Sequence, residues 1–169
     1  MQDLITALED SAIATFVRES PSIFAYTTVL SLHAMGLAVV VGVSLVIALR
    51  LLGGLRAVPV ANVLKLYPLM YVGFTVNAIS GLMLFAANAS GMLSNAAFLT
   101  KMGFIVLAMI MMELLRARGS AEATEAAAGA APSGATRAIG VAALGAWGAA
   151  IIAGRLTAYP NFVTSLLGL

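Results

Sequence analysis

The chain contains no cysteine and little charge, since Lys, Arg, Asp and Glu make up 9% of its 169 residues. Without cysteine it can form neither disulfides nor thiolate metal sites, and it cannot attach a c-type haem covalently. A soluble protein of this length needs more charged residues to cover its core. Because 62% of the residues are hydrophobic, the sequence predicts an integral membrane protein.

Acidic residues are missing from most of the apolar sequence, and histidine occurs once, as His33. Asp and Glu are confined to the N-terminal region, the end of the third apolar segment and the loop after it. This distribution disfavours a carboxylate-driven pump and a Ser-His-acid triad, and one histidine gives too few ligands for a protein-only metal site. The basic residues are scattered at segment ends, so we expect no nucleic-acid binding.

Four segments are apolar and long enough, or nearly so, to cross a bilayer as helices, which takes about 20 residues. They cover about 23–52, 66–89, 98–115 and 138–158, within a single transmembrane domain over 1–169. The stretch over 119–137 is small, polar and Pro/Gly-punctuated, which predicts a flexible loop. Before Pro21, apolar residues recur at roughly helical spacing, which predicts an interfacial helix or a frayed amphipathic tail.

Charge predicts the orientation of these segments. Basic residues flank the first and third connections, the second connection is uncharged, and the N-terminal region is acidic. The positive-inside rule places the first and third connections in the cytoplasm and both termini outside. Short connections predict antiparallel neighbours, so the expected fold is an all-α, antiparallel four-helix transmembrane bundle.

Three segments each carry one cationic or titratable residue at a similar predicted depth. Counting about 1.5 Å per residue from the cytoplasmic ends, His33, Lys101 and Arg155 lie about 25, 22 and 27 Å above the inner boundary. Ionisable groups in a bilayer usually face a bundle interior or a cavity. Lys101 and Arg155 lie near helix ends and could instead reach the headgroups, whereas His33 is too deep to do so easily.

Helical phase predicts further inward-facing residues. On the second segment, Asn77 shares a face with Gly73 and Gly81, as a ligand contact or as a hydrogen-bonding contact between helices. On the fourth, one stripe contains Leu144, Gly148, Ile151, Arg155 and Tyr159. Trp147 and Tyr159 are supporting site candidates or belong to the aromatic belt at the membrane surface. We expect the four stripes to face one another.

Haem suits this residue set because the porphyrin supplies four ligands and the protein needs to add one or two. His33 would bind the iron, and Lys101 and Arg155 would neutralise the propionates. Such a b-type haem module could pass electrons to a quinone or a periplasmic partner, and a quinone or another anionic amphiphile would fit the same site. The alternatives are a non-catalytic subunit or scaffold, in a homo-oligomer or membrane redox complex, and a carrier of a small anion.

Four stretches resemble a family of small bacterial inner-membrane proteins of unknown function: "ESPSIFAYTTVLSLHAMGLAVVVGVSLVIALRLLGG", "LYPLMYVGFTVNAISGLMLFAANA", "NAAFLTKMGF" and "WGAAIIAGRLTAYP". The resemblance covers about 19–160 and rests on His33, Gly42, Arg50, Gly81, Phe85, Phe98, Lys101, Trp147, Arg155 and Tyr159. Ala48 replaces the Asp that usually precedes "LRLLG". The resemblance implies a multi-pass protein of the bacterial inner membrane with periplasmic termini.

A fainter resemblance reaches the HemJ-type protoporphyrinogen oxidases and the copper-resistance D membrane proteins. These share an "LH" pair on the first helix and a later glycine and arginine. The HemJ type has a functional histidine on that helix, a functional lysine at the start of a later one, and haem b; His33 and Lys101 correspond in kind. The spacing from His33 to Gly42 and Arg50 differs, and a tryptophan expected after the histidine is missing. The resemblance thus implies shared architecture, without implying the same reaction.

Overall fold

The computed structural model describes residues 2–126 and 132–159, and these residues form helices and their connections without any strand. Four spans are long and apolar enough to cross a membrane: Ile23–Leu51, Val60–Ala86, Ala96–Glu122 and Gly134–Leu156. The corresponding helices are α3 (Ile23–Leu51), α4 (Val60–Leu64) with α5 (Tyr67–Ala86), α7 (Ala96–Ala126) and α8 (Gly134–Leu156). The prediction of an all-helical protein with four membrane-length helices is confirmed.

Local sequence signals set the ends of these helices. Ser22 begins α3, and its hydroxyl accepts a hydrogen bond from the amide two residues later at 3.3 Å. Gly53 ends α3 with a φ of 98°, a left-handed conformation that suits glycine. The amide of Gly54 then donates to the carbonyl of Leu49 at 2.9 Å, which completes a common helix stop. Pro68 lies in the first turn of α5, where no helical partner is lost.

The predicted loop over 119–137 is shorter than expected. Helix α7 continues to Ala126 and α8 already begins at Gly134, so the prediction is wrong at both ends of the stretch. Alanine and glutamate are frequent after Gly119 and favour helix, which explains the extension of α7. Residues 127–131 lie outside the described residues, as do residue 1 and 160–169.

Hydrogen bonds to Glu122 of α7 hold the start of α8 against α7. The Glu122 carboxylate accepts hydrogen bonds from the hydroxyls of Ser133, at 2.6 Å, and Thr136, at 2.7 Å. Thr136 is fully buried, and this contact gives its hydroxyl an acceptor.

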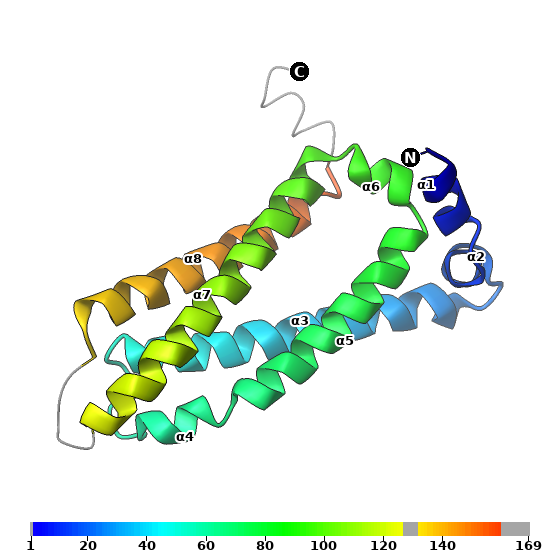
Figure 1. Cartoon of the computed structure of the whole chain (residues 1–169). Coiled ribbons are helices and arrows are strands. Elements are labelled where there is room, and N and C mark those ends of the chain that lie inside the picture. The colour runs from blue at the N-terminus through cyan, green and yellow to red at the C-terminus, as the bar shows by residue number, and fades with distance from the viewer. Residues whose placement is uncertain (1, 127–131, 160–169) are drawn as a thin grey trace.

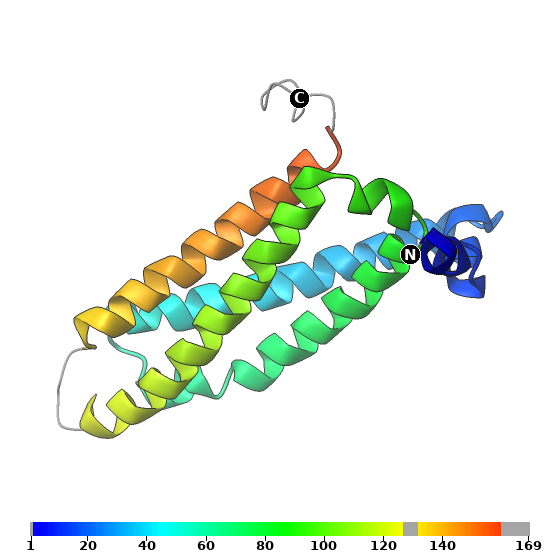
Figure 2. The ribbon, with the colours of Figure 1, turned by 45° about the horizontal axis from the view of Figure 1, so that its top comes forward.

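The long helices form two closely packed pairs, α3 with α5 and α7 with α8 (Figure 1). The pairs meet near α4, where α3 contacts α8 and α4 contacts α7, and they separate toward α6 (Ala89–Leu93) (Figure 2). The largest fully buried apolar side chains accordingly lie in the α4 half: Ile47, Leu51, Tyr67, Met70, Met112 and Leu115. The core therefore holds the two pairs together at one end.

Helices α5 and α7 are joined near their two ends and have few contacts in between. Near α4, the hydroxyl of Tyr67 donates to the carbonyl of Met112 at 2.7 Å. Near α6, the rings of Phe85 and Phe98 stack with their centroids 5.7 Å apart. Between these ends, Phe74 of α5 and Phe104 of α7 are partly buried and pack against the core.

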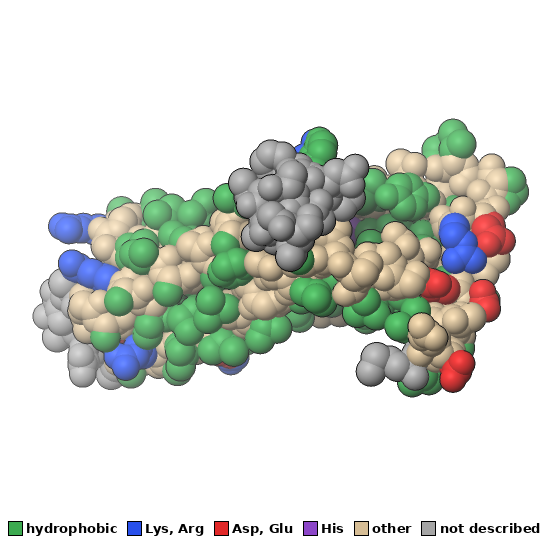
Figure 3. Space-filling view, turned by 90° about the horizontal axis from the view of Figure 1, so that it is seen from above, with side chains coloured by type: hydrophobic (Ala, Val, Ile, Leu, Met, Phe, Trp, Pro, Cys, Tyr) green, Lys and Arg blue, Asp and Glu red, His purple; other side chains and the backbone are tan. Residues whose placement is uncertain are grey.

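Basic side chains gather at one end of the bundle. On the face shown in Figure 3, most Lys and Arg side chains lie at the α4 end, and Asp and Glu lie at the end formed by α1 (Gln2–Glu9) and α2 (Ala12–Glu19), together with Arg18. Glu113 and Glu122 of α7 lie toward the α4 end. The basic residues of the first and third connections are Arg50, Arg56, Lys65, Arg116, Arg118 and Arg137. From these basic residues the positive-inside rule predicts that the α4 end lies in the cytoplasm, and this orientation stays a prediction.

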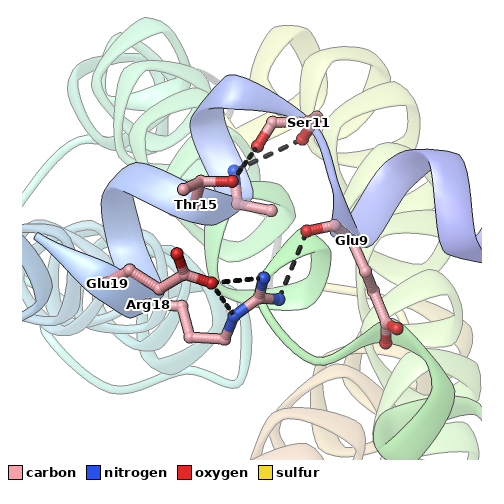
Figure 4. Close-up of polar contacts among 6 residues, drawn as sticks. Glu9, Ser11, Thr15, Arg18 and Glu19 are labelled. Carbon is pink, nitrogen blue, oxygen red and sulfur yellow. Dashed lines mark hydrogen bonds and ion pairs between the residues drawn. The ribbon is translucent and has the colours of Figure 1, made fainter.

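The N-terminal segment forms two short helices. Ser11 begins α2 by accepting a hydrogen bond from the amide of Ala14 at 3.3 Å, and Ala14 is fully buried where α2 packs on α3 and α5. Arg18 links the two helices, because it donates to the carbonyl of Glu9 at 3.2 Å and pairs with Glu19 at 2.8 Å (Figure 4). The segment is therefore packed on the bundle, and its place at a membrane surface stays a prediction.

Glu9 also joins these helices to α6. Its carboxylate accepts hydrogen bonds from the amide and the hydroxyl of Ser90, each at 2.8 Å. Both bonds lower the pKa of Glu9 below its usual value, and the bond from the Ser90 amide has the larger effect.

Acid should therefore release α1 from α6. A carboxyl whose folded pKa is lowered stabilises the fold above its unfolded pKa of about 4.3, and this contribution is lost as the pH falls through the folded pKa. Because the chain lacks cysteine, spin labels at Leu4→Cys and Leu93→Cys can report the α1–α6 distance by pulsed EPR. We expect a narrow distribution at pH 7 that broadens below pH ~4. Glu9→Gln should be broad at both pH values, and a narrow distribution in that variant would contradict the assignment.

Glycines let the backbones of α3 and α5 touch. A Cβ on Gly36 would lie 2.6 Å from the amide nitrogen of Asn77, and one on Gly73 would lie 2.7 Å from Cγ1 of Val39. Neither position has room for a methyl group. Small residues of this kind allow the close helix contact on which association in membranes depends.

Gly36→Ala should lower the free energy of unfolding by about 1–3 kcal/mol, because the added methyl group must push the α5 backbone away. Gly42→Ala is the matched control on the same helix, since nothing lies within 4 Å of its added Cβ. Thermal unfolding in detergent compares the two variants. Equal midpoints would show that the α3–α5 contact does not need glycine.

Candidate functional site

His33 and Asn77 form reciprocal hydrogen bonds between α3 and α5. The side-chain amide of Asn77 donates to the His33 carbonyl at 2.8 Å, and His33 Nδ1 lies 2.9 Å from the Asn77 carbonyl. The side-chain amide nitrogen of Asn77, which is a donor, lies farther from Nδ1, at 3.3 Å. We assign the hydrogen to Nδ1, because a carbonyl oxygen can only accept and the contact with the carbonyl is the shorter one. In the neutral imidazole the lone pair is then on Nε2. A hydrogen bond at the second ring nitrogen is the usual way in which proteins orient a metal-binding histidine.

Gly81 makes room for the imidazole. A Cβ on Gly81 would lie 2.9 Å from Cε1 of His33 and 3.2 Å from Nδ1. The hydroxyl of Ser80 lies 3.4 Å from Nδ1 but donates to the carbonyl of Val76 at 2.6 Å, so it is a secondary neighbour of the ring. Over residues 2–126 and 132–159, Nε2 has no hydrogen-bond partner, and His33 as a whole is half-buried.

Lys101 approaches the same region from α7. It is half-buried. Its side chain crosses Gly154 of α8, where an added Cβ would lie 3.3 Å from Cδ and 3.5 Å from Cε of Lys101. In the described part of the chain, no carboxylate lies within ion-pair distance of its ammonium.

Arg155 lies outside this group. It is exposed, and its guanidinium carbon lies 5.8 Å from the ring centroid of the exposed Tyr159, a cation–π contact. The predicted inward stripe of α8 is wrong, because the buried face consists of Gly140, Ala143, Ala146, Trp147, Ala150 and Ala153. The indole of Trp147, the largest side chain of this helix, turns into the core and rotates Arg155 away from it.

Trp147 is a core residue, with 2% of its surface exposed. Its indole nitrogen is buried without a hydrogen-bond partner among the described residues. Gly154 follows seven residues later on the same face of α8, about 10 Å along the axis. Trp147 therefore lies about two turns nearer to the core than the Lys101–Gly154 contact.

Two neighbours of the site, Ser80 and Gly154, were not predicted from the sequence. Ser80 lies three residues after Asn77, so helical spacing could have indicated it. Gly154 gives no comparable signal, because glycine recurs along α8.

Metal binding by protein side chains alone is not supported at this site. Within residues 2–126 and 132–159, no three His, Asp or Glu side chains are grouped so that they could hold a metal ion. A metal at His33 would have to arrive with most of its own ligands.

Comparison of the chain with protein-family models, with curated proteins and with solved structures gives no match. The resemblances noted from the sequence stay predictions, and the function has to be argued from the site itself.

The orientation of the imidazole can be tested directly, because His33 is the only histidine of the chain. In haem-free protein carrying ¹⁵N-histidine, NMR should show a protonated Nδ1 and an unprotonated Nε2, since Nδ1 donates to the Asn77 carbonyl. Gly81→Ala should shift both resonances by displacing the ring, whereas Gly42→Ala should leave them in place. A protonated Nε2 in the unmodified chain would contradict the hydrogen-bond assignment.

Proposed function

We propose that this chain is a membrane redox module that binds a b-type haem, with His33 as an axial ligand to the iron. The observation that carries the proposal is the 2.9 Å contact of Nδ1 with the Asn77 carbonyl, which leaves the Nε2 lone pair free. A haem bound here would supply one-electron chemistry. The chain's own part is to hold the imidazole in the tautomer and orientation that a metal needs.

The surroundings fit a porphyrin in two respects. The porphyrin brings four nitrogen ligands to a site where the described residues contribute one. Phe74 and Phe104, both partly buried, provide apolar side chains from α5 and α7.

The proposal differs from the sequence-based expectation in two residues, Arg155 and Tyr159. Arg155 is exposed and in contact with Tyr159, so we do not assign it to a propionate. Lys101 is the cation that accompanies His33. Asn77 orients the imidazole through its backbone carbonyl. Trp147 lies about two turns along α8 from Gly154, and its indole N–H has no hydrogen-bond partner among the described residues.

We further propose an antiparallel bundle in a bacterial inner membrane, with the basic α4 end in the cytoplasm. His33 and Lys101 would then lie in the outer leaflet. At this depth the module could exchange electrons with a quinone in the bilayer or with a periplasmic partner. The charge difference between the two ends of the bundle supports this orientation.

The visible spectrum of protein purified in detergent from haem-replete cells tests the proposal. We expect a Soret band, with α and β bands that sharpen when dithionite reduces the iron. His33→Ala should lose this absorbance because the iron loses its ligand, and added imidazole should restore part of it.

Gly42→Ala serves as the control and should keep full haem content, because nothing lies within 4 Å of its added Cβ. Normal haem content in His33→Ala would overturn the assignment of the ligand. A featureless spectrum of the unmodified protein, also after addition of haem, would overturn the function.

A carrier of a small anion is the second candidate, favoured by one observation. Lys101 is half-buried in a membrane-length helix, with no carboxylate in ion-pair distance among the described residues. Such a carrier would show no haem absorbance, and its anion binding would not change in His33→Ala. The visible spectra described above therefore separate the two candidates.

A further inference from the structure

Lys101 is held away from the usual position of a lysine near a membrane surface. Lysines close to helix ends normally extend to the headgroups. Here the side chain lies against α8, with Nζ 3.9 Å from the position of an added Gly154 Cβ, and the residue is half-buried. Gly154 makes this path available, because even a methyl group would force the lysine stem to move by a few tenths of an ångström.

The ammonium has no partner in the described part of the chain. No hydrogen bond or ion pair joins it to a described side chain. The acidic side chains that the structure describes lie elsewhere, in the α1–α2 region at one end of the bundle and at Glu113 and Glu122 toward the other. A charge without a partner among these residues is costly in a bilayer, and a ligand carboxylate is a group that could compensate it.

We propose that Lys101, positioned by Gly154, binds a carboxylate of the ligand whose iron His33 holds; on the proposed function, this carboxylate is a haem propionate. The inference rests on that function and adds a charge-specific subsite to it. His33 of α3 would hold the iron, and Lys101 of α7, which crosses α8, would hold the carboxylate.

Haem dimethyl ester is a suitable probe, because it keeps the iron and the macrocycle but removes both propionate charges. Affinities for haem and for its ester would be measured by absorbance titration of the full-length protein in phosphatidylcholine nanodiscs. A charge-assisted hydrogen bond corresponds to about a tenfold or greater preference for haem over the ester. Lys101→Met should remove the preference by weakening haem binding while leaving ester binding unchanged.

Two glycine variants provide a matched comparison. Gly154→Ala should reduce the preference for haem, since its methyl group would lie 3.3 Å from Cδ of Lys101, whereas Gly103→Ala on α7 meets nothing within 4 Å and should keep it. Equal affinities for haem and ester in the unmodified protein would overturn the inference. An equal loss of both affinities in Lys101→Met would also overturn it, by showing a structural role.

Metal-free protoporphyrin separates this inference from the proposed function, because it offers no iron to His33. A preference for protoporphyrin over its dimethyl ester that depends on Lys101 would support the carboxylate subsite even if His33→Ala bound haem normally. Iron-dependent binding through His33 without any preference between acid and ester would support the function and overturn the subsite. A protein that binds none of the four porphyrins would contradict both.

Discussion

Gly36 and Gly73 bring the backbones of α3 and α5 into contact, and the position of the imidazole depends on that contact. A Cβ at Gly36 would lie 2.6 Å from the backbone nitrogen of Asn77, the residue whose carbonyl holds His33 Nδ1. The hydrogen bonds between His33 and Asn77 can form because no side chain separates the two helices at this level. The same close contact needs Gly81, where the ring itself occupies the space of a side chain. Packing and chemistry are thus set by one seam of glycines.

Stability and the candidate chemistry lie in different halves of the bundle. Near α4, Tyr67, Met112 and their apolar neighbours join the two helix pairs through a buried core. Toward α6 the pairs separate, and there the structure holds a half-buried imidazole and a half-buried ammonium whose hydrogen-bonding capacity is not fully used by the described residues. Unsatisfied polar groups are tolerated where the rest of the fold does not depend on them, which is where ligand sites usually occur.

Hydropathy predicted the four membrane-length helices, because about 20 apolar residues have few other stable arrangements. Helical spacing also placed Asn77 on the inward face of α5, and His33 stood out as an isolated titratable group. The face of α8 was not predictable in the same way. Its sequence is rich in glycine and alanine on every side, so the burial of Trp147 decides the rotation, and Arg155 follows to the exposed side. Small and polar residues predict a loop over 119–137, but alanine and glutamate favour helix and extend α7 to Ala126.

Pulsed EPR of the ferric protein grown with ¹⁵N-histidine tests the central claim most directly. His33 is the only histidine, so any hyperfine coupling between ¹⁵N-histidine and the haem iron must come from this residue, in one copy of the chain or in two. The account predicts a directly coordinated histidine nitrogen, whose signal disappears in His33→Ala. Bound haem without a coupled histidine nitrogen would contradict it, because the orientation of the imidazole by Asn77 would then serve the packing of α3 on α5 and no metal.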